Sequence, residues 1–118
     1  MTEEIIELFK SVVETAWKEE KAFGNAIFGT YPKRNANLCQ GISRNIYHKI
    51  FGTFPNTFMA KFEVNKQSHI VVHVSYGLQS YVIDGTIKQF LPQEERTVFP
   101  RKEYPFKKEF QTCERWLC

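Results

Sequence analysis

Hydrophobic and polar residues follow two different periods along the chain. In residues 2–24 the apolar side chains recur at helical spacing and glutamates fill the first turn, which predicts an amphipathic helix ending at Gly24. In residues 38–51 they recur at every fourth position, which predicts a second helix ending before Gly52. Residues 25–37 lie between them and contain three asparagines, a glycine and a proline, so they predict a loop.

From Thr57 the hydrophobic period changes to two. Residues 57–64, 68–76 and 80–86 are rich in β-branched and aromatic side chains and are joined by short polar or glycine-containing segments, so they predict three adjacent antiparallel strands. Residues 91–118 contain three prolines, which exclude a long helix or a central strand. We expect this tail to run extended over the core and to bury its large apolar side chains, namely Phe99, Tyr104, Phe106, Phe110, Trp116 and Leu117.

Length and composition favour one globular domain. The chain has 118 residues, of which 42% are hydrophobic and 25% are charged, and this suffices for a single core. The expected fold class is α+β, with an N-terminal helix (1–24), a core (35–90) and a wrapping tail (91–118).

Charge and hydropathy argue against two other classes of protein. The net charge is +3 and no run of Lys or Arg exceeds two residues, whereas nucleic-acid binding requires a dense basic patch. No apolar segment reaches the roughly 18–20 residues that span a bilayer, and the acidic start lacks the basic region of a secretory signal. We expect a soluble protein, either cytoplasmic or exported by a signal-independent route.

A hairpin closed at Gly77 and Leu78 would give the second and third strands a definite register. Val72 then lies opposite Ile83, and one face of the sheet is apolar. The other face carries the polar residues His69, His73, Asp84 and Thr86. We expect the start of the second helix, which contains Cys39, to pack against this polar face.

Cys39 is a candidate nucleophile. A thiol at a helix N-terminus ionises more readily than a free thiol, and the thiolate attacks carbonyl carbon. A histidine can take and return the proton while a carboxylate orients the imidazole, and we assign these roles to His69 and Asp84. Backbone N–H groups at the helix start, with Asn37 and Gln40, are candidates for holding an oxyanion. His73 is expected at the rim of the site, in contact with solvent or substrate.

The same residues have other interpretations. Cys39 can be a buried apolar side chain, His69 a strand histidine with a satisfied hydrogen bond, and Asp84 a turn residue. A further hypothesis makes Cys39, His69, His73 and Asp84 the ligands of a metal ion.

Two more cysteines lie in the tail. Cys113 and Cys118 are either free thiols or a local disulfide, and the sequence leaves both open. The odd number of cysteines argues against a disulfide framework.

Two segments resemble a known superfamily. The segment CQGIS (39–43) resembles the nucleophile helix of papain-like proteins, where a small residue and a serine follow the cysteine. The segment HIVVHVSYGLQSYVIDGT (69–86) is similar to the transglutaminase-like pattern, where a strand histidine precedes an aspartate by about fifteen residues. His69 and Asp84 have that spacing. Gly85 departs from the pattern, which has proline there, and no tryptophan flanks the cysteine or the histidine.

The resemblance implies a papain/transglutaminase-like core and acyl transfer from an amide, without a cofactor. The reaction would be proteolysis, glutamine deamidation or transglutamination. The small size favours a protein substrate that brings its own exposed glutamine or peptide loop, as for bacterial effectors and toxins of this type. The alternative is a catalytically inactive binding or adaptor module on the same scaffold. We expect no nucleic-acid or membrane partner, and the sequence does not determine the oligomeric state.

Overall fold

The computed structural model describes residues 2–28 and 38–116, which form an α+β fold. Helices α1 (Thr2–Phe28) and α2 (Leu38–Ile50) precede strands β1 (Thr57–Val64), β2 (Gln67–Tyr76) and β3 (Gln79–Ile83). The remaining elements are η1 (Ile87–Gln89), β4 (Val98–Pro100), η2 (Arg101–Glu103), α3 (Lys107–Phe110) and β5 (Glu114–Trp116). The α+β class predicted from the sequence is therefore confirmed.

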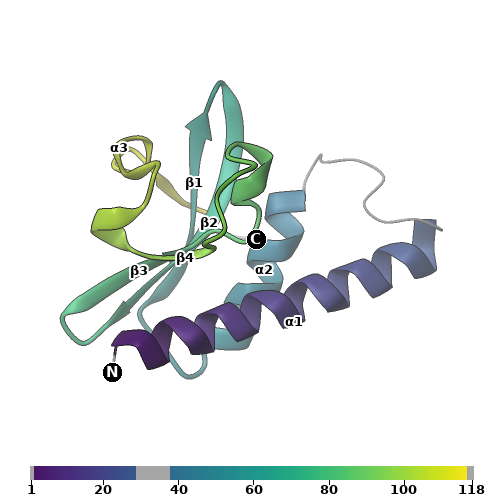
Figure 1. Cartoon of the computed structure of the whole chain (residues 1–118), viewed down its shortest axis with the longest axis horizontal. Coiled ribbons are helices and arrows are strands. Elements are labelled where there is room, and N and C mark those ends of the chain that lie inside the picture. The colour runs from purple at the N-terminus through teal and green to yellow at the C-terminus, as the bar shows by residue number, and fades with distance from the viewer. Residues whose placement is uncertain (1, 29–37, 117–118) are drawn as a thin grey trace.

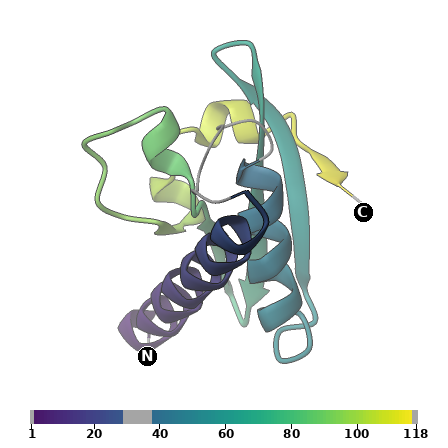
Figure 2. The same ribbon diagram turned by 90° about the vertical axis from the view of Figure 1, so that its right-hand side faces the viewer.

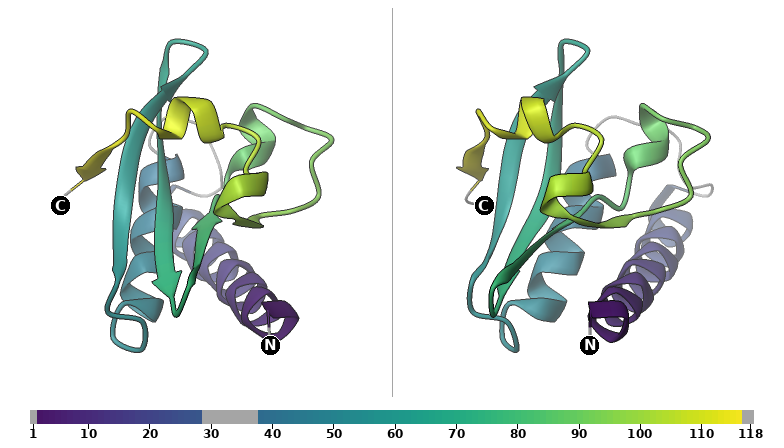
Figure 3. Two further views of the ribbon diagram at one scale, coloured as in Figure 1. Left: turned by 90° about the vertical axis from the view of Figure 1, so that its left-hand side faces the viewer. Right: turned by 60° about the vertical axis from the view of Figure 1, so that its left-hand side comes forward.

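The strands form one antiparallel sheet in the order β4-β3-β2-β1-β5, so β2 lies at its centre. Helix α2 lies on one side of β1 and β2, and α3 lies on the other side (Figure 1). Helix α1 packs beside α2 and runs obliquely across it (Figure 2). In the C-terminal third, α3 lies beside the long β1–β2 hairpin, and η2 lies beside β3 and β4 (Figure 3). The sheet is thus covered on both faces.

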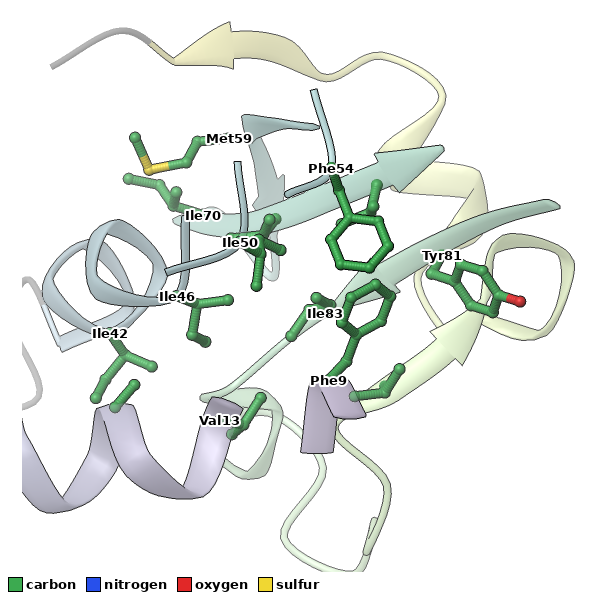
Figure 4. Close-up of a cluster of buried hydrophobic side chains, with 14 of the residues drawn as sticks. Phe9, Val13, Ile42, Ile46, Ile50, Phe54, Met59, Ile70, Tyr81 and Ile83 are labelled. Carbon is green, nitrogen blue, oxygen red and sulfur yellow. The ribbon is translucent and has the colours of Figure 1, made fainter. Parts of the chain in front are cut away.

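Each face of the sheet has its own hydrophobic cluster. Figure 4 shows the cluster between the long helices and the sheet, where Phe9 and Val13 of α1 and Ile46 of α2 meet Tyr81 and Ile83 of β3. The second cluster joins the opposite face to the C-terminal third and includes the buried side chains of Ala60, Phe62, Val71, Val82, Phe99, Tyr104, Phe106 and Phe110. Four of the six tail side chains that the sequence predicted to be buried are therefore part of the core, namely Phe99, Tyr104, Phe106 and Phe110. Trp116 is only half-buried, and Leu117 lies outside the described residues.

The three predicted strands and the hairpin register are confirmed, except that the third strand was predicted to reach residue 86 and β3 ends at Ile83. Val72 pairs with Ile83, and Tyr76 pairs with Gln79, so the hairpin closes at Gly77 and Leu78. Gly77 has a φ of +62°, a value that glycine adopts without steric cost.

Two other predictions about the elements were wrong. Helix α1 continues past Gly24 to Phe28, because one glycine costs only about 1 kcal/mol inside a helix and does not end it alone. The tail forms β4 and β5 in addition to short helices, whereas only an extended wrap was predicted. Strands of three residues are too short to show a period of two. Among the described residues, no helix combines the length and the apolar character that crossing a membrane requires.

The predicted position of α2 was also wrong. Its buried residues Ile42, Ile46 and Ile50 pack on the apolar face of the sheet with Ile70 and Val72, and not on the face that carries His69 and Asp84. A helix with an apolar stripe gains more free energy on an apolar face than on a polar one. The C-terminal third covers the polar face instead.

His73 lies at the centre of a stack of side chains on this second face. Its ring is sandwiched between Phe58, with ring centroids 4.8 Å apart, and Phe110, at 5.6 Å. The guanidinium of Arg115 lies over the far side of Phe58, and that of Arg101 lies over the far side of Phe110. His73 is 4% exposed. The expectation that it contacts solvent at the rim of a site is therefore wrong.

The stack keeps His73 uncharged. Burial is the main cause, and the positive charges of Arg101 and Arg115 add to it, so that the pKa of His73 falls to about 4. Neither ring nitrogen has a hydrogen-bond partner among the described residues.

His73 predicts a pH dependence of stability. Its pKa in the folded protein lies below the ordinary 6.5, so the unfolded chain binds the proton more tightly, and stability is lost as the pH falls from 6.5 towards 4. We expect the free energy of unfolding of wild type, minus that of His73→Phe, to fall by on the order of 2 kcal/mol across this range. Urea unfolding at several pH values measures it. A difference independent of pH would contradict the prediction.

Candidate active site

The site is built around a buried pair of polar side chains, His69 and Asp84. His69 belongs to β2, and Asp84 is the first residue after β3. The His69 Nε2–H group donates a hydrogen bond of 2.7 Å to Asp84 Oδ2, and neither side chain is exposed. The sequence spacing singled out this pair, and the structure brings its two members together. His73 is not bonded to Asp84.

Asp84 accepts two more hydrogen bonds. The Tyr104 hydroxyl donates to Oδ2 at 2.6 Å, and the backbone N–H of Thr86 donates to Oδ1 at 3.2 Å. The aspartate's own N–H donates to the carbonyl of Thr97 at 2.7 Å. A buried carboxylate is costly unless such donors surround it. These contacts therefore fix Asp84 with both oxygens in use.

The sequence interpretation did not identify Tyr104 as part of the site. Tyr104 lies 20 residues after Asp84 and was assigned only to the aromatic wrap. It is a buried tyrosine in a tail whose other buried aromatic side chains are phenylalanines. A hydroxyl at such a position needs a buried partner, and this was the available signal.

Cys39 lies in the first turn of α2 and is half-buried. Ser43 is four residues further on, so it shares the helix face with Cys39. The Ser43 hydroxyl donates a 2.8 Å hydrogen bond to the carbonyl of Ile70, the residue after His69. This bond fastens the face of α2 that carries the thiol to the part of β2 that carries the imidazole.

The environment of His69 favours its charged form. Burial opposes the charge, but the hydrogen bond and the attraction of Asp84, with smaller contributions from the neighbouring Cys39, raise the pKa of His69 to about 9. The rings of Phe62 and Phe90 contact the imidazole in edge-to-face geometry, with ring centroids 5.6 and 4.9 Å from that of His69. His69 Nδ1 is buried and has no partner in hydrogen-bond geometry among the described residues. The Cys39 sulfur therefore lies close enough to the ring to stabilise its charged form, both as a hydrogen-bond acceptor and by electrostatic attraction.

Gly85 brings the helices close to the site. A Cβ atom at this position would lie 2.7 Å from Ile42 Cγ2 and 3.2 Å from Ile46 Cδ1. The Trp17 indole N–H of α1 donates a 2.8 Å hydrogen bond to the Gly85 carbonyl. Both helices therefore contact the residue that follows Asp84, and proline, which the transglutaminase-like pattern has here, does not fit.

The other candidate residues have different positions. Gln40 follows Cys39 in α2 and is half-buried. Asn37 lies outside the described residues, as does Cys118. Cys113 is a free thiol, and burial is the main cause of its raised pKa.

The metal hypothesis is not supported by the described part of the chain. Within residues 2–28 and 38–116, no group of three or more His, Cys, Asp and Glu side chains is arranged to hold a metal ion. His73, one of the four suggested ligands, lies instead between two phenylalanine rings.

Comparison with protein-family models, with curated proteins and with solved structures finds no match to this chain. The resemblance to papain-like and transglutaminase-like proteins therefore depends on the motif residues alone.

The raised pKa of His69 predicts a titration that depends on Asp84. In wild type, the imidazole should titrate near 9, and in Asp84→Asn it should titrate below 6.5, because burial then acts without the carboxylate. Because the folded pKa exceeds the ordinary value, the stability that this pair contributes is complete below pH 6.5 and is lost as the pH rises through 9. NMR titration of the histidine rings measures both values.

His73 provides the control in the same spectra. It should titrate near 4 in both proteins, because Asp84 does not contribute to its pKa. If His69 titrates near 6.5 in wild type, the electrostatic description of the site is wrong.

The close packing at Gly85 predicts a position-specific cost. Gly85→Ala should destabilise the fold by roughly 1–3 kcal/mol, because the added methyl group overpacks the contact with Ile42. In the double variant Gly85→Ala/Ile42→Leu, the leucine has no Cγ2 methyl group to contact the new alanine Cβ. The double variant should therefore lose less stability than the sum of the losses in the two single variants. Gly52→Ala is the control, since nothing lies within 4 Å of a Cβ there. Urea unfolding measures each variant, and equal costs at both glycines would refute this explanation.

Proposed function

We propose that this protein is a thiol-dependent amide hydrolase or acyltransferase. Cys39 is the nucleophile, His69 the acid and base, and Asp84 the residue that orients the imidazole. The observation that carries the proposal is the buried Asp84–His69 hydrogen bond with Cys39 as the electrostatic neighbour of the same ring. A base held by a carboxylate and placed beside a nucleophile is the arrangement that activated thiols require.

The two ring nitrogens of His69 have separate roles in this reaction. Nε2 is committed to Asp84, which leaves Nδ1 to exchange a proton with the thiol and the substrate. Nδ1 is buried and has no hydrogen-bond partner among the described residues, so it is available for that exchange. The raised pKa of His69 supports an imidazolium at neutral pH, and an imidazolium can give its proton to the leaving nitrogen.

The chemistry proceeds in two balanced steps. The Cys39 sulfur adds to the carbonyl carbon of an amide, the C–N bond breaks, and the nitrogen leaves with the proton from His69, which yields a thioester. Water or an amine then attacks the thioester and gives its proton to His69, and the Cys39 sulfur leaves as thiolate. Backbone N–H groups at the start of α2 would stabilise the oxyanion that forms in each step.

The substrate that fits best is a protein. Cys39 is half-buried and His69 is fully buried, so the reacting amide must be presented at the start of α2 on a protruding group. An exposed glutamine side chain or a peptide loop has that shape. Ammonia leaves in the first case and an amine in the second.

The proposal predicts that Cys39 is unusually reactive towards iodoacetamide. At pH 7 Cys39 should be alkylated at least about tenfold faster than Cys113, whose thiol pKa is raised by burial. His69→Gln should reduce the Cys39 rate by about tenfold or more, because the positive charge beside the sulfur is lost. Peptide mass spectrometry gives the rate at each cysteine separately.

His73→Phe is the matched control, since it changes a histidine of the same strand and keeps the aromatic stack. It should leave the Cys39 rate unchanged. Ordinary reactivity of Cys39 in wild type, or a rate independent of His69, would favour the inactive binding or adaptor module instead.

A further inference from the structure

A basic cleft lies at the end of the sheet opposite to His69. It has a volume of about 510 Å³ and opens between the β2–β3 turn, η2 and α3. Figure 1 shows this turn at the lower left, below the yellow-green segment that carries η2. The cleft is lined by Leu78, Gln79, Ser80, Pro100, Arg101, Lys102, Lys107 and Gln111. Every ionisable side chain in this lining is basic.

The three cations are not neutralised by the rest of the described chain. Arg101, Lys102 and Lys107 take part in none of the ion pairs found among residues 2–28 and 38–116. Arg96, which is close in sequence, pairs with both Glu94 and Glu103. Glu94 and Glu103 are thus paired with Arg96 next to the cleft, and no acidic side chain belongs to its lining.

Two of the cations are held in place by the protein. The Lys107 ammonium donates a 3.1 Å hydrogen bond to the carbonyl of Lys102, and the Arg101 guanidinium lies 5.2 Å from the centroid of the Phe110 ring. A ligand that binds here therefore loses less side-chain entropy than it would on free lysines. Leu78, at the tip of the turn, is fully exposed and adds an apolar surface to the same cleft.

We propose that this cleft is a docking surface for an acidic segment of a partner protein. Carboxylates of the segment pair with Arg101, Lys102 and Lys107, and an apolar side chain of the segment packs on Leu78. Complementary charge with one apolar anchor gives both a fast encounter and a defined position. The proposal does not depend on the catalytic one.

The chemistry of the cleft fits a peptide better than the other polyanions. Nucleic-acid binding uses many phosphate contacts and exposed aromatic rings for base stacking, whereas this lining has three cations and no aromatic side chain. Adsorption to an anionic membrane uses clusters of four to eight basic residues, each of which contributes about 1 kcal/mol of binding free energy. The cleft has only three.

The cleft is far from the candidate active site. His69 is the third residue of β2 and Leu78 lies in the turn after it, so about nine residues of extended chain, roughly 30 Å, separate them. A segment docked in the cleft leaves Cys39 accessible.

Fluorescence anisotropy at low ionic strength tests the proposal. The probe is a short fluorescein-labelled peptide with glutamates on both sides of a central leucine. A second peptide, in which glutamine replaces every glutamate, measures the binding that remains without the negative charges. Replacing both Lys102 and Lys107 by glutamine should weaken binding of the acidic peptide at least about fivefold. The matched control removes the same charge from α1, with Lys18→Gln and Lys21→Gln, and should change the affinity less than twofold.

Further measurements address the anchor and the type of partner. Leu78→Ser should weaken binding of the leucine peptide and leave unchanged the binding of a peptide with serine at that position. If the cleft double variant and the α1 double variant lose equal affinity for the acidic peptide, the proposal is overturned, because the attraction would then depend on the net charge of the protein and not on the cleft. It would also be overturned by a lack of binding, or by tighter binding of a single-stranded oligonucleotide or of phosphatidylserine vesicles than of the peptide.

Discussion

The buried carboxylate of Asp84 is the group on which the arrangement of this protein depends. A charged carboxylate without water is stable only where donors surround it, and its donors come from three different parts of the chain: His69 of β2, the Thr86 backbone and Tyr104 of the C-terminal third. These bonds join the end of β3 to the centre of the sheet and to the segment that covers it. Removing any donor leaves part of the charge unsatisfied, so the fold and the candidate site share one constraint.

The two histidines of β2 show how surroundings determine the state of a side chain. They lie four residues apart and point to the same face of the sheet. His69 meets a carboxylate and is held as a cation, whereas His73 meets two phenylalanine rings and, beyond them, two guanidinium groups, and is held neutral. Only one of them can therefore act as an acid at neutral pH. The other holds the C-terminal third of the chain on the sheet through aromatic packing.

The sequence predicted local features better than the pairing of distant segments. The helix at 38–50, the first three strands and the hairpin register follow from periodicity and a two-residue turn. The register placed both His69 and His73 near Asp84, and the spacing of the transglutaminase-like pattern selected His69. The wrong face was predicted for α2, because the polar side chains of one face were interpreted as partners of Cys39, whereas burial of the apolar stripe of α2 favours the apolar face. The contact of Tyr104 with Asp84 was missed for a different reason. It depends on short strands and single turns that have no readable period.

The approach of α2 to His69 from the opposite face follows from where β3 ends. Strand β3 pairs with β2 only from Val72 to Tyr76, so no strand among the described residues pairs with the first half of β2 on that side. The carbonyl of Ile70 in this half is bonded by Ser43, a side chain of α2, in place of a backbone N–H. The chain then leaves the sheet at Gly85, where the absence of a Cβ lets Ile42 approach. A longer β3 or a larger residue at 85 would move the helix away, so the position of Cys39 beside His69 depends on a strand that ends early.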